Sequence, residues 1–138
     1  KFQLQAEQQN ITLAVEPKDP SLQAVADIAK LERVLTNLID NALRHCQPGD
    51  SITIQLQPKD NQVIISIVDS GVGIPAEDVD HIFDAHYRAK NTVNGNQGNS
   101  GLGLAIVVKL LALHHAKISV SSVLAQGTTF SFSLPSSA

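Results

Sequence analysis

The sequence predicts an α+β fold, in which a largely antiparallel β-sheet carries helices on one face. The first observation is that strand patterns occur in two closely spaced pairs of segments, 51–57 with 62–68 and 117–123 with 128–134; three of these alternate apolar and polar residues, and 62–68 is nearly all apolar. The second is that each pair is joined by a short turn, which brings consecutive strands together in antiparallel order. The third is that segments of helical periodicity lie between the pairs, where they can cover one face of the sheet.

The bulk properties limit the classes of protein that fit. A length of 138 residues suits one compact domain, and a net charge of −3 argues against a nonspecific nucleic-acid binder. No apolar run approaches the roughly 20 residues that cross a bilayer. The single cysteine, Cys46, cannot form an internal disulfide, which fits a reducing cytosol. Because the chain opens at Lys1 and lacks methionine, we expect a piece of a longer protein.

The first elements are a strand and a long helix. Residues 9–15 alternate as a half-buried strand does, and Pro17 and Pro20 end the pattern. Asp27 is expected to cap a helix that closes before the turn at 48–50. The apolar stripe of this helix consists of Ile28, Leu31, Val34, Leu35, Leu38, Ile39 and Ala42.

The middle of the chain supplies the strand that we expect at the centre of the sheet. Residues 62–68 are nearly all apolar, which predicts a central strand covered on both faces and ending at Asp69. A short helix is expected after Pro75, because proline suits a first helical turn and Glu77 and Asp78 would lie near its positive end.

The later part of the chain predicts a loop followed by a helix. Residues 85–100 are polar and rich in asparagine, and long loops inside compact domains are usually lids or binding loops. Residues 102–113 are apolar enough for a helix that packs against the sheet. The final two strands are expected to be joined through Gln126 and Gly127.

Two asparagines lie one helical turn apart in the long helix. Asn37 and Asn41 are poor helix formers, and the spacing i, i+4 points both amides to one side. An amide oxygen is a neutral, hard ligand that suits Mg²⁺ and polar phosphate neighbours. Arg44 and His45 fall in the same sector of the helix. The pair alone is equally compatible with a solvated helix face.

Two glycine motifs have the residue types of a nucleotide site. Asp69 follows the central strand, and its carboxylate could accept a hydrogen bond from an exocyclic amine while Gly71 and Gly73 let the backbone approach a flat base. An ordinary turn would look the same. Residues 98–103 lead from the polar loop into a helix, so glycine N–H groups could face an anion there. A flexible hinge is the alternative for this segment.

These motifs matter in combination. Asn-x-x-x-Asn on a helix, Asp-x-Gly-x-Gly after a strand, a polar loop, Gly-x-Gly into a helix and Gly-Thr on a strand together resemble the catalytic, ATP-binding domain of bacterial sensor histidine kinases. That family shares a superfamily with DNA gyrase B, the Hsp90 chaperones and the MutL proteins (the GHKL or Bergerat fold). The resemblance covers residues 9–135, and residues 1–8 would be the tail of a preceding dimerisation helix.

The resemblance implies a two-layer α/β sandwich with a mixed, mostly antiparallel sheet and about three helices on one face. A lid over the nucleotide would span residues 84–101. The family's motifs would fall on 37–41, on 69–73, on 82–88 and on 98–103. Nucleotide contacts are implied for Asn37, Asn41, Arg44, His45, Asp69, Gly71, Gly73, Ile74, Tyr87, Arg88, Ser100, Gly101, Leu102, Gly103, Leu104, Thr128 and Thr129.

The resemblance also implies roles. Asn41 would hold Mg²⁺, Asp69 would bind adenine N6, and Asn37, Asn41 and Arg44 would form the catalytic set. Arg44, His45 and Arg88 would neutralise the phosphates of ATP. Three positions depart from the family pattern: His86 stands where many relatives carry phenylalanine, Asn99 where glycine is frequent, and His115-Ala116 where Gly-Gly is usual.

The implied function is that of a protein-histidine kinase with ATP and Mg²⁺ as cofactors. The γ-phosphate would go to a histidine on the protein's own dimerisation and phosphoacceptor domain, and from there to a response regulator. The full-length protein would be a homodimer with this domain in the cytoplasm, attached to an inner-membrane sensor, and the domain itself would contact neither nucleic acid nor membrane. None of the five histidines is followed by an acidic residue, as family acceptors are.

Two other functions stay open. An ATPase of the same superfamily would use nucleotide-gated dimerisation, and a degenerate module would have lost ATP binding. The hydrolysing relatives place a glutamate base where this chain has Asn37, and a neutral amide cannot take a proton from water. Intact Asn41, Asp69 and Gly101-x-Gly103 argue against the degenerate module.

Overall fold

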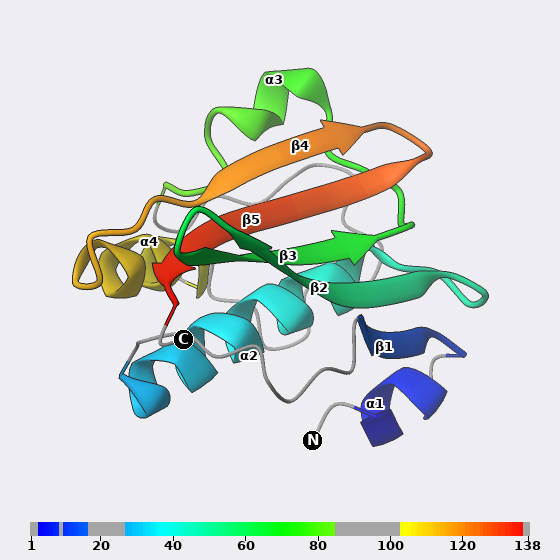
Figure 1. Ribbon diagram of the computed structural model, residues 1–138. Coiled ribbons are helices and arrows are strands. Elements are labelled where there is room, and N and C mark those ends of the chain that lie inside the picture. The colour runs from blue at the N-terminus through cyan, green and yellow to red at the C-terminus, as the bar shows by residue number, and fades with distance from the viewer. Residues whose placement is uncertain (1–2, 9, 17–26, 85–102, 137–138) are drawn as a thin grey trace.

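The computed structural model describes residues 3–8, 10–16, 27–84 and 103–136 and shows helices packed on one face of a five-stranded sheet (Figure 1). The helices are α1 (Gln3–Gln8), α2 (Ile28–His45), α3 (Ala76–Val79) and α4 (Gly103–Ala112). The strands are β1 (Thr12–Glu16), β2 (Ser51–Lys59), β3 (Gln62–Asp69), β4 (Ser119–Val123) and β5 (Gly127–Pro135). The predicted α+β class is confirmed.

The sheet has the order β1-β2-β3-β5-β4, and every neighbouring pair except β1 with β2 is antiparallel. β2 and β3 are joined by Asp60 and Asn61, both with positive φ (52° and 65°), which matches the twist that two-residue hairpins require. β1 begins at Thr12, later than the predicted position 9, which lies outside the described residues. The predicted antiparallel hairpins are confirmed.

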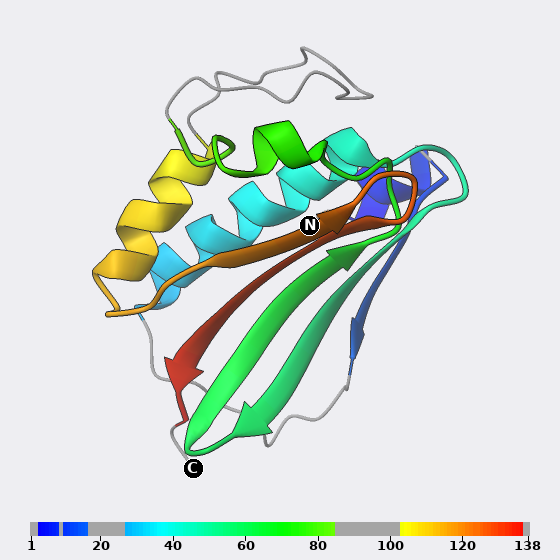
Figure 2. The same ribbon diagram turned by 90° about the horizontal axis from the view of Figure 1, so that it is seen from above.

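The prediction that β3 is the central strand is right, but the prediction that both its faces are covered is wrong. Val63, Ile65 and Ile67 are buried, whereas Ile64 and Val68 on the opposite face are half-buried. Figure 2 shows α2 and α4 side by side on one face of the twisted sheet. The apolar run at 62–68 arises because β-branched residues also suit the more open face of a strand.

Helix α2 begins where the sequence predicts. Asp27 caps it by accepting a hydrogen bond of 3.1 Å from the Lys30 N–H at its Oδ1. Val34, Leu38 and Ala42, three members of the predicted stripe, have no exposed surface. Burial of this stripe against the sheet therefore fixes which face of α2 remains for function.

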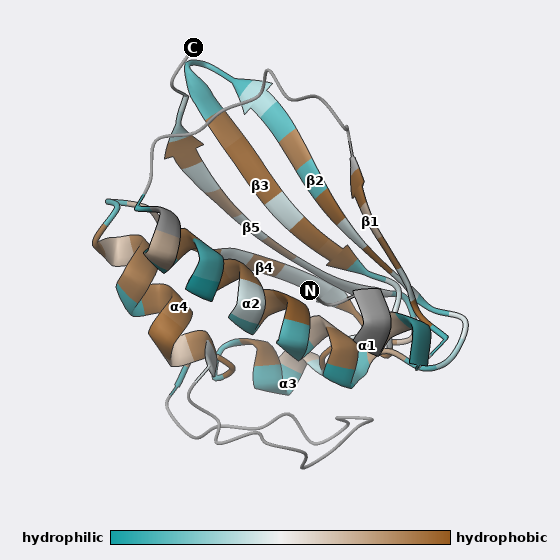
Figure 3. Ribbon diagram, turned by 90° about the horizontal axis from the view of Figure 1, so that it is seen from below, coloured by the Kyte–Doolittle hydropathy of each residue, from teal (hydrophilic) through white to brown (hydrophobic). Residues whose placement is uncertain are grey.

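The shorter helices differ slightly from expectation. α4 runs over 103–112 and buries Val107 and Leu111, and Figure 3 shows that it is hydrophobic over most of its length whereas α2 alternates apolar and polar residues. α3 has four residues, with Pro75 at its N-cap rather than in its first turn. No helix in the described ranges is both long and apolar enough to cross a membrane.

The core lies between the sheet and α2 and includes Val34, Leu38 and Ala42 of that helix's stripe. Phe130 of β5 is fully buried and meets Phe83 edge to face, with ring centroids 6.1 Å apart. Cys46 ends α2 with 1% of its surface exposed, and burial raises the pKa of its thiol to about 12. Ala6 of α1 also joins the core. Whether residues 1–8 continue a preceding dimerisation helix stays a prediction.

Candidate functional site

The loop that follows β3 is held against the C-terminal end of α2. The Val72 N–H donates a hydrogen bond of 2.9 Å to the His45 carbonyl. Gly71 passes so close that a Cβ atom there would lie 2.2 Å from the same carbonyl oxygen. Only glycine permits this approach, so the first predicted glycine of the 69–73 motif joins the loop to the helix that carries the asparagines.

The other side of the loop rests on the turn between β4 and β5. Gly73 has a φ of +77°, and a Cβ atom there would lie 2.4 Å from the Val123 carbonyl oxygen. The Ala125 N–H donates a hydrogen bond of 2.9 Å to the Val72 carbonyl. The loop is thus fixed between α2 and the β4–β5 turn, which gives its backbone a defined path beside Asp69.

Ser122 is a supporting residue that the sequence interpretation missed. Its Oγ accepts a hydrogen bond of 2.7 Å from the Ile74 N–H and lies 2.8 Å from the Thr128 Oγ1. It therefore joins the loop to β5. The sequence held a signal for this role. Val120 and Ser122 occupy the inward positions of β4, and Ser122 is polar where an apolar residue is usual. A polar residue at an inward strand position needs a partner, and here the loop supplies it.

The start of α4 lies beside the middle of α2. The Cβ position of a side chain at Gly103 would be 3.8 Å from the Asn37 Oδ1. The Nδ2 of Asn37 is buried and has no hydrogen-bond partner among the described residues. A buried amide nitrogen left without an acceptor is costly, so it marks a place for an acceptor that the described residues do not supply.

Asp69 is a buried carboxylate at the end of the central strand. Its side chain accepts a hydrogen bond of 2.9 Å from the Gly71 N–H, and 4% of the residue's surface is exposed. Burial raises the pKa of this carboxyl group to about 6, against the lowering effect of the Gly71 and Thr128 backbone, and Asp50 adds a further negative charge nearby. The group is an acceptor whose charge no described cation compensates.

His45 does not have the charge that we expected. Its Nδ1 lies 2.8 Å from the Asn41 carbonyl, so Nδ1–H donates and Nε2 bears a lone pair. Burial lowers the pKa of the ring, which is therefore neutral near pH 7. Nε2 is buried without a hydrogen-bond partner among the described residues. The structure therefore argues against phosphate neutralisation by His45, and the ring can instead accept one hydrogen bond.

Arg44 and Asn41 lie on the same helix as His45. Arg44 pairs with Asp40, one turn earlier, and is half-buried, so a phosphate would have to share or displace this ion pair. The Asn41 side chain is also half-buried. Within the described ranges no three His, Cys, Asp or Glu side chains cluster closely enough to hold a metal ion.

The two threonines of the last motif point to opposite faces of the sheet. Thr128 is paired with Asp69 and is buried on the helix-covered face. Thr129 is paired with Val68, whose side chain lies on the other face, because successive strand residues alternate. This pairing favours Thr128 over Thr129 as a nucleotide contact, and both contacts stay predictions.

The remaining candidates divide into two groups. Ile74 is buried and Leu104 is half-buried, Ile74 in the loop and Leu104 in the first turn of α4. Residues 85–101 of the predicted lid lie outside the described residues, as do Tyr87, Arg88, Ser100, Gly101 and Leu102.

Residues 26–138, which hold every motif of the site, match the family described as histidine kinase-, DNA gyrase B- and HSP90-like ATPases. The chain belongs to this family. The resemblance inferred from the sequence is confirmed, and the fold of this ATPase-family domain is that of histidine kinase catalytic domains.

Sensor histidine kinases are among the relatives of this ATPase-family domain. The sensor protein SrrB of Staphylococcus aureus is 38% identical over 109 residues, which are 79% of this chain and 19% of SrrB, so the chain spans about a fifth of that relative. The catalytic domain of histidine kinase ThkA is 30% identical with a TM-score of 0.82, over 97% of this chain and 84% of that one.

Two further solved structures show related proteins with bound molecules. Full-length ShkA in complex with AMPPNP has a TM-score of 0.81 and 27% identity, over 98% of this chain and 27% of ShkA. ThkA in complex with the response regulator protein TrrA has a TM-score of 0.76 and 27% identity, over 97% of this chain and 36% of that one.

Proposed function

We propose that this ATPase-family domain binds Mg²⁺-ATP and donates the γ-phosphate to a histidine on a separate dimerisation and phosphoacceptor domain of a sensor kinase. The observation that carries the proposal is Asp69, a buried acceptor with 4% exposure at the end of the central strand. A carboxylate in that position selects a base with an exocyclic amine, such as adenine, because a base without the donor would leave the carboxylate unpaired.

The phosphates are expected to lie between α2 and the start of α4. The unpartnered Nδ2 of Asn37 supplies a donor there. The start of α4 at Gly103 faces Asn37, and N–H groups at a helix N-terminus there would bind phosphate and add partial positive charge. Arg44 is the nearby cation on α2, provided that it shares its carboxylate partner Asp40.

The residues present fit a magnesium ion. Mg²⁺ prefers oxygen ligands, keeps several waters and is often held by one or two protein groups together with substrate phosphates. The half-buried amide of Asn41, one turn after Asn37, offers such an oxygen. When bound there with the phosphates, Mg²⁺ would offset their negative charge.

The identity of the acceptor follows from Asn37. The bond between the γ-phosphorus and the bridging oxygen breaks, and the phosphoryl group forms a new bond either to water or to a nucleophile that needs no base here. A neutral amide cannot deprotonate water, whereas a neutral imidazole nitrogen attacks with its own lone pair. Asn37 therefore favours histidine over water as the acceptor. Phosphoryl transfer then depends on positioning and charge stabilisation.

The proposal extends to the whole protein. None of the five histidines here is followed by an acidic residue, so we place the acceptor on a dimerisation domain of a homodimer. ThkA, solved with response regulator TrrA, supports a response regulator as the later recipient of the phosphate. We place the domain in the cytoplasm as part of an inner-membrane sensor, without contacts to nucleic acid or membrane.

Transfer to a histidine in trans is the direct test. The chain is incubated with γ-labelled ATP and the separately produced dimerisation domain of the full-length protein. The label is expected on that domain, stable in alkali and lost in acid, as a phosphorus–nitrogen bond requires. Omission of the dimerisation domain is the control. Rapid release of inorganic phosphate without labelled protein would instead establish the ATPase alternative.

The magnesium role of Asn41 predicts a change in metal dependence. In the wild type, addition of Mg²⁺ is expected to raise the affinity for a fluorescent ATP analogue. In Asn41→Ala, the increase in affinity caused by Mg²⁺ should be smaller by on the order of tenfold. Thr36→Ala, on the same helix, is the control. An unaltered Mg²⁺ titration of Asn41→Ala would remove Asn41 as the ligand.

A further inference from the structure

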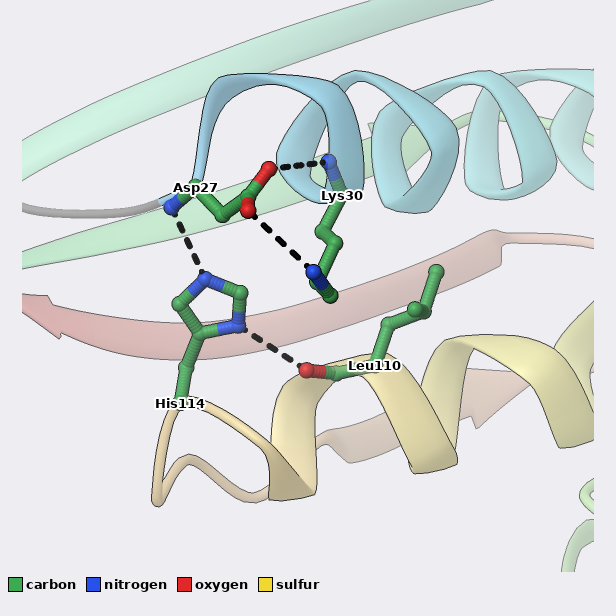
Figure 4. Close-up of polar contacts among 4 residues, drawn as sticks. All are labelled: Asp27, Lys30, Leu110 and His114. Carbon is green, nitrogen blue, oxygen red and sulfur yellow. Dashed lines mark hydrogen bonds and ion pairs between the residues drawn. The ribbon is translucent and has the colours of Figure 1, made fainter.

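We propose that His114 is a positioning residue that joins the far ends of α2 and α4 and thereby holds the two helices that form the nucleotide site. The inference rests on the proposed function, because it concerns how that site is kept assembled. Figure 4 shows the His114 ring between the two helix ends, with one ring nitrogen toward Asp27 and the other toward the Leu110 carbonyl.

On the α2 side, His114 completes the N-terminal cap. Asp27 Oδ1 accepts from the Lys30 N–H at 3.1 Å, as an N-cap side chain should. In a capping box, a Glu or Gln three residues after the cap accepts from the cap residue's own N–H. That position here is Lys30, which has no acceptor, and the Asp27 N–H donates instead to His114 Nε2 at 3.0 Å. The turn after α4 thus supplies, through His114, the acceptor that the capping box of α2 lacks.

On the α4 side, the same ring caps the carbonyl end of the helix. His114 Nδ1–H donates to the Leu110 carbonyl at 2.9 Å, which satisfies one of the carbonyl groups that a helix leaves unpaired. The chain then turns through His115, whose φ is 58°, and the Ala116 N–H donates to the Leu111 carbonyl at 2.9 Å. This turn fixes the ring at the end of α4.

The His114 joint, formed by its contacts with Asp27 and the Leu110 carbonyl, lies at the opposite end of the α2–α4 pair from the nucleotide site. Asp27 is ten residues before Asn37 on α2, and His114 is eleven residues after Gly103, so the helices run antiparallel between the two contacts. At 1.5 Å per residue the separation is about 15 Å. Loss of the His114 contact would let α4 shift along α2, and the Gly103 end of α4 would move relative to Asn37.

The joint requires a neutral ring. Nε2 accepts from a backbone N–H, so a proton on Nε2 would place two donors face to face. The Asp27 carboxylate cannot compensate, because its Oδ1 and Oδ2 already accept from the Lys30 N–H and Nζ, each at 3.1 Å. Lys30 also lowers the pKa of Asp27, so the carboxylate keeps its charge. The joint therefore requires the His114 tautomer that carries its proton on Nδ1 and a lone pair on Nε2.

The test compares two substitutions of His114 with a neighbouring control. His114→Phe keeps a ring without hydrogen bonds, and His114→Gln keeps a side-chain acceptor for the Asp27 N–H. His115→Asn removes an adjacent exposed imidazole at a positive φ that asparagine tolerates. Affinity for a fluorescent ATP analogue is measured on the 138-residue chain at about pH 8. Exchange of the Asp27 amide proton is followed by NMR.

At about pH 8, His114→Phe should bind the analogue about two- to fivefold more weakly than the wild type, the loss expected for one exposed hydrogen bond. His114→Gln and His115→Asn should lie within about twofold of the wild type. The decisive quantity is the affinity that His114→Gln recovers relative to His114→Phe, because glutamine restores an acceptor for the Asp27 N–H.

Two results would overturn the joint: equal affinity of His114→Phe and wild type, or a loss of affinity in His114→Gln as large as that in His114→Phe. Amide exchange separates this failure from failure of the proposed function. If the wild type binds no ATP analogue, the proposed function is wrong and the site role of His114 falls with it. Faster exchange of the Asp27 amide in His114→Phe would then still establish the structural contact, and unchanged exchange would refute it.

Discussion

Replacement of Asp69 by asparagine is expected to abolish adenine-nucleotide binding and at the same time to stabilise the fold. Asparagine keeps an oxygen for the Gly71 N–H but replaces the second carboxylate oxygen, which would accept from the base, with an amide donor. Two donors would then meet, and affinity for a fluorescent ATP analogue should drop at least about a hundredfold. Undiminished affinity would refute the role of Asp69.

The stability gain follows from the pKa of Asp69. A rise from 3.8 to about 6 in the folded state means that ionisation opposes folding at neutral pH by about 2–3 kcal/mol. Asparagine has no such cost, so the free energy of unfolding of Asp69→Asn should exceed that of the wild type above about pH 6. As the pH falls through 6 toward 3.8, the folded wild type takes up a proton first and the difference should disappear.

Denaturant unfolding of both proteins at several pH values measures this difference. Asp80→Asn is the matched control, because it removes the same charge from an exposed position at the end of α3. The control should leave binding of the ATP analogue unchanged. A variant Asp69→Asn that lost both binding and stability would show that the carboxylate is needed by the fold itself, against the proposal.

The second large effect is expected for Gly73→Ala. The change places a Cβ atom 2.4 Å from the Val123 carbonyl oxygen and forces alanine to a φ of +77°. Overlap with backbone atoms cannot be relieved by a rotamer change, so the loop or β4 must move. We expect a loss of about 3 kcal/mol or more in the free energy of unfolding, together with weaker nucleotide binding.

Gly49 provides a matched control for the backbone strain. Its φ is +94°, but a Cβ atom there would meet nothing within 4 Å. Gly49→Ala should therefore cost only the strain of the left-handed conformation, about 1 kcal/mol. The difference between the two variants, measured by denaturant unfolding, isolates the contact with Val123. Equal losses in both would show that the loop does not depend on that contact.

Much of the fold could be predicted because the decisive signals are local. Alternation located the strand pairs, and Asp27 marked the start of α2, because both signals depend on neighbouring residues alone. The partial failure at β3 has the same origin: Ile64 and Val68 are apolar, but their exposure depends on which elements cover that face. Sequence alone could not supply that tertiary information.

The site was less predictable where partners come from elsewhere in the chain. Thr128 and Thr129 are adjacent, and only the pairing with β3 shows which of them shares a face with Asp69. The neutral state of His45 depends on its burial and on the Asn41 carbonyl, neither of which the sequence displays. The His114 contact spans 87 residues and belongs to no local pattern. All three of these features could be assigned only from the packed structure.

The buried cysteine allows local unfolding around the C-terminal end of α2 to be measured by thiol labelling. Only a thiolate reacts quickly with alkylating reagents, and Cys46 is shielded from both solvent and ionisation, with 1% exposure and a pKa raised to about 12. Since it is the only thiol in the chain, each modification records one event in which the C-terminal end of α2 separates from the sheet. When reclosing is faster than modification, the labelling rate therefore reports the free energy of local opening beside the proposed nucleotide site, without any introduced probe.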